Sequence, residues 1–139
     1  MSTPKTNSEY LLLFRGADWP CDLSPAELQE AMSKVRLWFE GLANQGIMKA
    51  AQPLSDEGRI VSCKTGGTIA DGPFVESKEA IGGYLIVTVN TLEEAVAIAR
   101  QNPMLQYGGS VEVRPIAEEC PHMKRLGLSM SGELAGASV

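Results

Sequence analysis

The sequence contains few of the residues from which catalytic and metal sites are most often built. Its single histidine is His122, and its three cysteines, Cys21, Cys63 and Cys120, show no CxxC spacing. An odd number of cysteines without paired spacing predicts reduced thiols, and neither a disulfide framework nor a structural zinc site. We therefore expect no metal site and no cofactor.

Basic charge and long apolar runs are also scarce. The 12 Lys and Arg residues are scattered and are outnumbered by 17 Asp and Glu, which gives a net charge of −5. Because nucleic-acid binding requires clustered cations, we expect no nucleic-acid partner. No apolar run approaches the roughly 20 residues that span a bilayer, and the segment Met1–Glu9 lacks the apolar core of a signal peptide. The sequence thus predicts a cytoplasmic protein without a membrane partner.

The residues that are present suit one globular domain. A chain of 139 residues with 44% hydrophobic and 21% charged residues can bury its apolar surface around a single core. We expect a flexible leader over residues 1–8, a folded domain over 9–116 and a C-terminal tail or dimer arm over 117–139, where Gly, Ser and Ala are frequent.

Two helices are predicted by the residues at their ends. Ser24 is an N-cap candidate, followed by a proline at the first helical position and by Glu27 three residues after the cap. Apolar residues then recur at helical spacing until Gly46, which suits a helix end. Thr91–Glu94 predicts a second capping box, and its helix ends before Asn102 and the following proline.

Short apolar or alternating runs predict the strands, and their order predicts the fold. The runs are Tyr10–Phe14, Gly46–Leu54 at a sheet edge, Ile60–Lys64 and Thr68–Ala70 as a small hairpin, Tyr84–Val89, and Ser110–Ile116. Together with the helices they give an α+β domain of the ferredoxin-like split βαβ type, with an antiparallel sheet, two helices on one face and one extra hairpin.

Two of the predicted strands are apolar on both alternating faces. Tyr10–Phe14 and Tyr84–Val89 have this character, which is typical of strands that are buried on both sides. Two helices cover only one face of such a sheet. We therefore expect a homodimer in which the sheet of a second copy covers the other face, with a pocket between the facing sheets.

Charged residues are predicted to line this space. Arg15 shares strand parity with Leu13, and Glu112 and Arg114 share the face of the last strand opposite its valines. An arginine in a confined apolar space suits a ligand carboxylate. The alternative is an ion pair between subunits, with Glu112 or Glu79 as the partner of an arginine.

Further candidates lie just before the Tyr84 strand. Asp71 begins an Asp-Gly-Pro sequence, in which aspartate either bonds the backbone of a turn or serves as a pocket carboxylate. Glu79 stands at the entry to the strand and is a second candidate carboxylate. Phe74 and Tyr84 are either core or interface aromatics or ligand contacts, and His122 suits an exposed position in the tail.

The segment Asp71–Glu79 (DGPFVESKE), followed by Ile81–Tyr84 (IGGY), resembles the YCII-related, DGPF-motif family. The resemblance extends over roughly residues 9–116, including Tyr10–Phe14 (YLLLF) and Gly108–Ile116 (GGSVEVRPI). It implies a dimeric α/β barrel. Members of the family are often linked with extracytoplasmic-function sigma factors, and some relatives carry a His-Asp pair proposed as catalytic. This sequence departs from that pair, because its only histidine, His122, lies beyond the matched region.

Three functions remain open at this level. The first is a dimeric binding or regulatory module with a small-molecule pocket, favoured because no nucleophile–base pair is visible in the sequence. The second is an enzyme of the dimeric α/β-barrel type that acts on a small metabolite, with Asp71, Glu79 or Arg114 in its pocket. The third is an accessory partner of a sigma factor, which the family resemblance alone implies.

Overall fold

Four antiparallel strands form the main sheet in the computed structural model, which describes residues 8–16, 23–61, 69–71 and 80–128. The strands are β1 (Ser8–Arg15), β2 (Met48–Pro53), β5 (Ile81–Val89) and β6 (Ser110–Pro115), in the order β2-β5-β1-β6. This order places the first and third strands of the split βαβ pattern at the centre. The predicted ferredoxin-like α+β fold is confirmed, and β2 lies at a sheet edge as expected.

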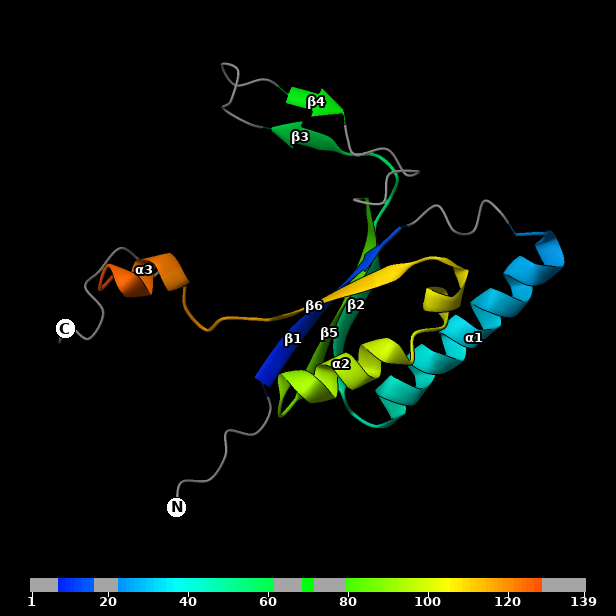
Figure 1. Cartoon of the computed structure of the whole chain (residues 1–139), viewed down its shortest axis with the longest axis horizontal. Helices are drawn as coiled ribbons and strands as arrows, with labels where there is room; N and C mark the ends of the chain where they lie inside the picture. Colours follow the sequence, from blue (N-terminus) through cyan, green and yellow to red (C-terminus); the bar gives the residue numbers. More distant parts are fainter. Residues whose placement is uncertain (1–7, 17–22, 62–68, 72–79, 129–139) are drawn as a thin grey trace.

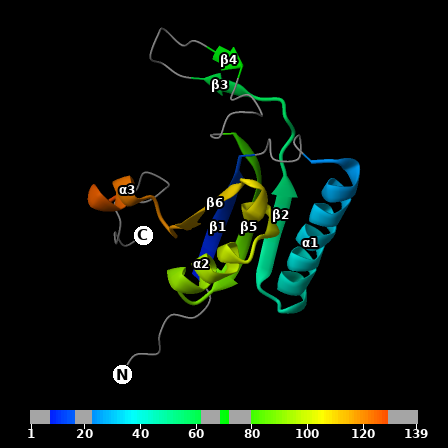
Figure 2. The ribbon, with the colours of Figure 1, turned by 45° about the vertical axis from the view of Figure 1, so that its right-hand side comes forward.

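Both long helices lie on the same face of this sheet (Figures 1 and 2). They are α1 (Pro25–Asn44) and α2 (Leu92–Arg100). Among the residues that the structure describes, no helix is both long and apolar enough to cross a membrane.

The start of α1 is stabilised by the predicted capping box. The Ser24 hydroxyl accepts a hydrogen bond from the Glu27 amide at 3.2 Å, and the Glu27 carboxylate accepts one from the Ser24 amide at 3.0 Å. The hydrogen bond from the Ser24 amide favours the charged carboxylate and, with a smaller contribution from the Ser24 side chain, lowers the pKa of Glu27 below its ordinary value of 4.5. After the helix, Gly46 takes the left-handed conformation with φ of 71°, as predicted.

The cap of α2 differs in one detail from the predicted reciprocal box. The Thr91 hydroxyl accepts from the Glu94 amide at 3.1 Å, as expected. The Glu94 carboxylate, however, accepts from the amide of Asn90 at 3.4 Å, one residue before the cap. The apolar stripes are also narrower than predicted: Met32 and Leu92 are exposed, because a helix lying on a sheet buries only the side chains that point at the strands.

The core fills the space between the helices and the sheet. Leu12 of β1 and Leu85 and Val87 of β5 are fully buried there. Phe14, Trp38 and Phe39 form an edge-to-face aromatic cluster at one end of this layer, with ring centroids 5.0 to 6.2 Å apart. Trp38 is thus packed against the core, as its place on the helical stripe predicted.

Two peripheral elements extend from this body. Strands β3 (Arg59–Val61) and β4 (Ile69–Asp71) pair in a separate two-stranded sheet that stands away from the main sheet in both views (Figures 1 and 2). The predicted hairpin is therefore confirmed, although its turn, residues 62–68, lies outside the described residues. At the other side, the short helix α3 (Pro121–Arg125) follows β6 and contains the exposed His122.

The face of the sheet opposite the helices, called here the open face, carries apolar side chains from the central strands. Burial alternates along β1 and β5, so that Leu12 and Leu85 face the helices while Leu11, Leu13 and Ile86 lie half-buried on the open face. The register joins Leu11 to Ile86 and Leu13 to Tyr84. The centre of the open face is thus a continuous apolar patch.

Candidate functional site

A cavity of about 580 Å³ lies at the end of the main sheet. The ends of β1 and β2 and the beginnings of β5 and β6 meet there, close to α1 and to the 3₁₀ helix η2 (Pro103–Tyr107). Its described lining consists of Phe14, Arg15, Phe39, Met48, Ala51, Gln52, Pro53, Leu54, Asp56, Gly82, Gly83, Tyr84, Asn102, Met104 and Ser110. An apolar space of this size with a few polar groups is typical of small-molecule sites.

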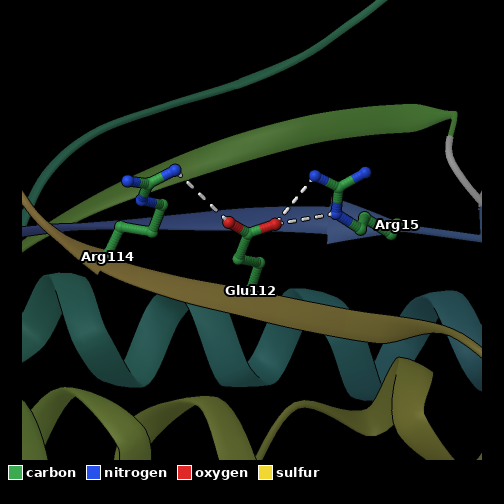
Figure 3. Close-up of polar contacts among 3 residues, drawn as sticks. All are labelled: Arg15, Glu112 and Arg114. Atoms are coloured by element: carbon green, nitrogen blue, oxygen red, sulfur yellow. Dashed lines mark hydrogen bonds and ion pairs between the residues drawn. The ribbon is translucent and has the colours of Figure 1, made fainter.

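The charged residue of β1 in this lining, Arg15, is held by β6. Its Nε and Nη2 atoms donate to the same carboxylate oxygen of Glu112, at 3.0 and 2.7 Å. The Arg114 guanidinium lies 3.7 Å from the other carboxylate oxygen. Figure 3 shows the three side chains on the side of β6 away from the helices, with Glu112 between the two arginines. The charge of Arg15 is therefore compensated within the chain.

A second ion pair lies on the opposite rim of the sheet. Lys49 of β2 pairs with Glu9 of β1, across the intervening strand β5. A register shift in β2 between Met48 and Ala50 inserts Lys49 into the strand as an extra residue. Charged groups thus border the apolar patch of the open face on both sides.

Asn102 is the buried polar residue of the cavity lining. Only 3% of its surface is exposed, and its Oδ1 atom accepts a hydrogen bond from the Met104 amide at 3.0 Å. This bond fixes which way the side-chain amide points, because the oxygen must face the amide donor. The Nδ2 atom is buried and has no hydrogen-bond partner in the part of the chain that the structure describes. A buried donor of this kind is rare in proteins and costs stability.

Gly83 gives the cavity wall its close strand packing. A Cβ atom at this position would lie 3.0 Å from the Gln52 carbonyl oxygen and 3.3 Å from Pro53 Cα. Both atoms belong to the backbone of β2, which pairs with β5 here. Glycine therefore allows the two strands to come together beside the cavity.

The structure brings only part of the predicted site together. Arg15 and Tyr84 both line the cavity. Glu112 and Arg114 lie on the open face beside it. The sequence predicted an ion pair between subunits as one alternative, whereas Arg15 and Glu112 pair within one chain.

The side chains of the remaining predicted residues are not among those that the structure describes. Asp71 is the last residue of β4, where only the backbone is described. Phe74 and Glu79 lie outside the described residues. Within the described part, no three His, Cys, Asp or Glu side chains form a group that would hold a metal ion.

Among the lining residues that sequence reasoning missed are Gln52, Asn102 and Met104. Asn102 entered the sequence argument only as part of a helix end. Nothing in the local pattern distinguishes a buried asparagine from an exposed one, because its burial depends on strands that are distant in the sequence.

The chain belongs to the YCII-related domain family, whose members it matches over residues 10–119. A stretch of 53 residues is 42% identical to an uncharacterised protein of Rhizobium meliloti (strain 1021), and covers 35% of this chain and 40% of that protein. The expected family resemblance is thus confirmed.

Among solved structures, the chain is similar to 5-chloro-2-hydroxyhydroquinone dehydrochlorinase from Burkholderia phenoliruptrix AC1100 in complex with 2,5-dihydroxybenzoquinone. The two are 14% identical with a TM-score of 0.42, over 82% of this chain and 97% of the other. A likeness at this level says nothing about the chemistry of this chain.

Proposed function

We propose that this protein is a small-molecule-binding module that works as a two-fold dimer, with the cavity at the end of the sheet as its ligand site. One observation carries the proposal: Arg15 and Tyr84 belong both to the open face and to the cavity lining. A second copy placed on the open face would therefore border the cavity. Dimer formation and ligand binding would share residues.

The apolar patch of the open face supports the dimer. Leu11, Leu13, Tyr84 and Ile86 are half-buried although both long helices lie on the other side of the sheet. Covering such a patch with the same patch of a second copy removes apolar surface from water on both molecules. The ion pairs on the rims keep their charges at the border of the contact, where water is accessible.

The lining of the cavity supports a small organic ligand. Aromatic, thioether and aliphatic side chains such as Phe14, Phe39 and Met104 supply an apolar surface. Gln52 and Ser110 supply hydrogen-bonding groups at its border. A volume of about 580 Å³ accommodates a molecule of one or two rings.

The dimer is tested by placing a charge in the apolar patch. Leu13→Glu buries a carboxylate against the partner and is expected to convert the protein to monomers, because an unpaired buried charge is strongly unfavourable. Leu37→Glu is the matched control, since Leu37 of α1 is 61% exposed on the helical side. Sedimentation velocity measures the mass of each variant. A monomeric wild-type protein at micromolar concentration, or a dimeric Leu13→Glu variant, would overturn the proposed dimer.

The ligand site is tested by narrowing the cavity. Leu54→Trp adds bulk to the wall, and Leu37→Trp is the same substitution on an exposed leucine outside it. α-Methylstyrene, an uncharged aromatic compound, is titrated into ¹⁵N-labelled protein, and the amide signals of Gly82 and Gly83 are followed. We expect saturable shifts in the wild type and in Leu37→Trp, and weaker binding in Leu54→Trp. If these signals do not move in the wild type, the cavity is not a ligand site.

The two other functions predicted from the sequence have separate tests. An enzyme would turn over a bound compound, which product analysis of the titrated mixtures would reveal. A sigma-factor accessory protein would co-purify with the sigma factor. Both remain predictions.

A further inference from the structure

Strand β6 is an edge of the main sheet that no described strand covers. It lies at the end of the order β2-β5-β1-β6, and its register with β1 is regular from Ser110 to Pro115. The opposite edge strand, β2, contains the extra residue Lys49, and such a bulge hinders the pairing of a further strand. The regular edge of β6 is therefore the one that suits strand addition.

The backbone groups on this edge belong mainly to two valines. The Ile116 amide donates to the Glu9 carbonyl of β1 at 2.9 Å. Because backbone direction alternates along an antiparallel strand, the even-numbered residues of β6 point toward β1, and Val111 and Val113 direct their N–H and C=O groups outward. Pro115 has the same direction but offers only its carbonyl, since proline has no N–H.

An apolar groove lies beside this edge, between β6 and α2. It has a volume of about 350 Å³. Its described lining consists of Val96, Ala99, Arg100, Leu105, Val111 and Val113. Leu105 is partly exposed here, as is Leu92, which lies one turn before Val96 on the same flank of α2. The short helix α3, which follows β6, stands clear of α2 in both views (Figures 1 and 2).

The charges on this flank of α2 are self-complementary. Glu93 and Arg100 are exposed, and neither forms an ion pair with another described residue. About two turns of helix separate them, so they lie on the same side, with Val96 between them. Two copies of α2 that pack antiparallel would bring Glu93 of each opposite Arg100 of the other.

The charges on β6 select one register for the pairing of two copies about a two-fold axis. Outward-directed residues must face each other, so that the axis passes through a residue of β6. An axis at Glu112 or at Arg114 would place identical charges directly opposite, which is destabilising. An axis at Val113 places Glu112 of each copy opposite Arg114 of the other, on the open face.

The hydrogen bonds are satisfied in the same register. With the axis at Val113, the two copies of this residue exchange both backbone bonds, and the Val111 amide of each reaches the Pro115 carbonyl of the other. An axis at Val111 would set Val113 opposite Gly109, whose amide is already bonded to the Met104 carbonyl at 3.1 Å. The axis at Val113 is therefore favoured by charges and by backbone bonds.

This axis also brings the helices together. Strands β5 and β6 both run antiparallel to β1, so that the connecting helix α2 runs antiparallel to β6, and the groove sets Val96 beside Val113. We propose that a second copy of this chain docks on this edge, with β6 paired to β6 about Val113 and α2 antiparallel to α2. The contact lies at the sheet edge and is separate from the proposed open-face dimer, so that it would join two such dimers. One strand edge and one helix flank make a small interface, and we expect association only well above micromolar concentration.

The charges of α2 provide matched variants. Arg100→Glu and Glu93→Arg each convert both helix charge pairs into repelling ones without touching the open face. Sedimentation equilibrium of the full chain is measured from micromolar to millimolar concentration. The wild-type mass should double across this range, and each variant should associate about tenfold more weakly. An equal mixture of the two variants should regain the wild-type affinity, because one then carries two acidic and the other two basic groups on this flank.

Hydrogen exchange, followed by NMR, locates the contact. The amides of Val111 and Val113 should exchange more slowly at millimolar than at micromolar concentration, whereas those of Glu112 and Arg114, which point toward β1, should be protected at both. An unchanged wild-type mass up to millimolar concentration, or a mixture that associates no better than either variant alone, would overturn the contact. Association without slower exchange at Val113 would overturn the strand pairing. The mass at micromolar concentration, which tests the open-face dimer, should be the same in the wild type and in both variants.

Discussion

Gly83 provides the sharpest test of how the sheet is built beside the cavity. Replacing it with alanine adds a single methyl group between β5 and β2. The new Cβ atom would lie 3.0 Å from the Gln52 carbonyl oxygen, 3.3 Å from Pro53 Cα and 3.5 Å from the Phe14 ring. The two closest atoms are backbone atoms, which cannot rotate away as a side chain would. Strand β2 must therefore shift, or the ladder between β2 and β5 must open locally.

The expected cost follows from these contacts. Overpacking of a close contact usually costs about 1–3 kcal/mol, and we expect Gly83→Ala to lie within this range. The matched control is Gly41→Ala, because a Cβ atom at Gly41 would meet nothing within 4 Å and the residue lies inside α1. Glycine inside a helix is less favourable than alanine by about 1 kcal/mol, so this control should stabilise the protein. Replacing glycine with alanine should therefore lower the free energy of unfolding at position 83 and raise it at position 41.

Urea unfolding followed by circular dichroism measures both effects. The midpoint should fall for Gly83→Ala and rise for Gly41→Ala, with little change in the slope of the transition. Because the methyl group also pushes on the cavity wall, α-methylstyrene binding should weaken in Gly83→Ala and not in Gly41→Ala. A Gly83→Ala variant as stable as the wild type would show that β2 and β5 are not packed as closely as the structure has them.

Three further predictions concern the core, the open face and the first helix. Leu12→Ala should lower the free energy of unfolding by about 2–5 kcal/mol in urea titrations, because Leu12 is fully buried. If Leu12→Ala lowers the free energy of unfolding by less than the same substitution at the exposed Leu37, Leu12 is not part of the core. A double-mutant cycle of Arg15→Met and Glu112→Gln should give a coupling of about 0.2–1 kcal/mol at low salt, since both side chains are about one-third exposed. Zero coupling at low salt would mean that the pair does not form in solution. For Glu27→Gln, the wild type should be the more stable protein above pH 4.5, and this advantage should vanish as the pH falls through the lowered pKa of Glu27. A difference that grows in acid would contradict the capping box.

Much of the fold was predictable because its signals are local. The capping residues of α1, from Ser24 to Glu27, satisfy backbone groups within four residues, so that the sequence predicts where the helix begins. Continuous apolar runs of strand length likewise predict β1 and β5. The predicted apolar stripes of α1 and α2 included Met32 and Leu92, which are exposed in the structure. The width of a buried helix face depends on the elements that it packs against, and the sequence does not show these.

The candidate site was only partly predictable. Alternation along β1 and β6 placed Arg15 and Glu112 on one face, and the structure pairs them across the two strands. The cavity at the end of the sheet was not predicted, since its wall joins η2 to strands that lie far from it in the sequence.

The amino-acid sequence by itself determined the helices, the strands and their order, because caps, turns and apolar periodicity act over a few residues. The tertiary structure alone decided that Asn102 is buried without a partner for its donor, and that it shares a cavity with Arg15 and Tyr84. These residues belong to three different elements of the chain. Their proximity comes from strand order and helix packing, which depend on the burial of the whole core.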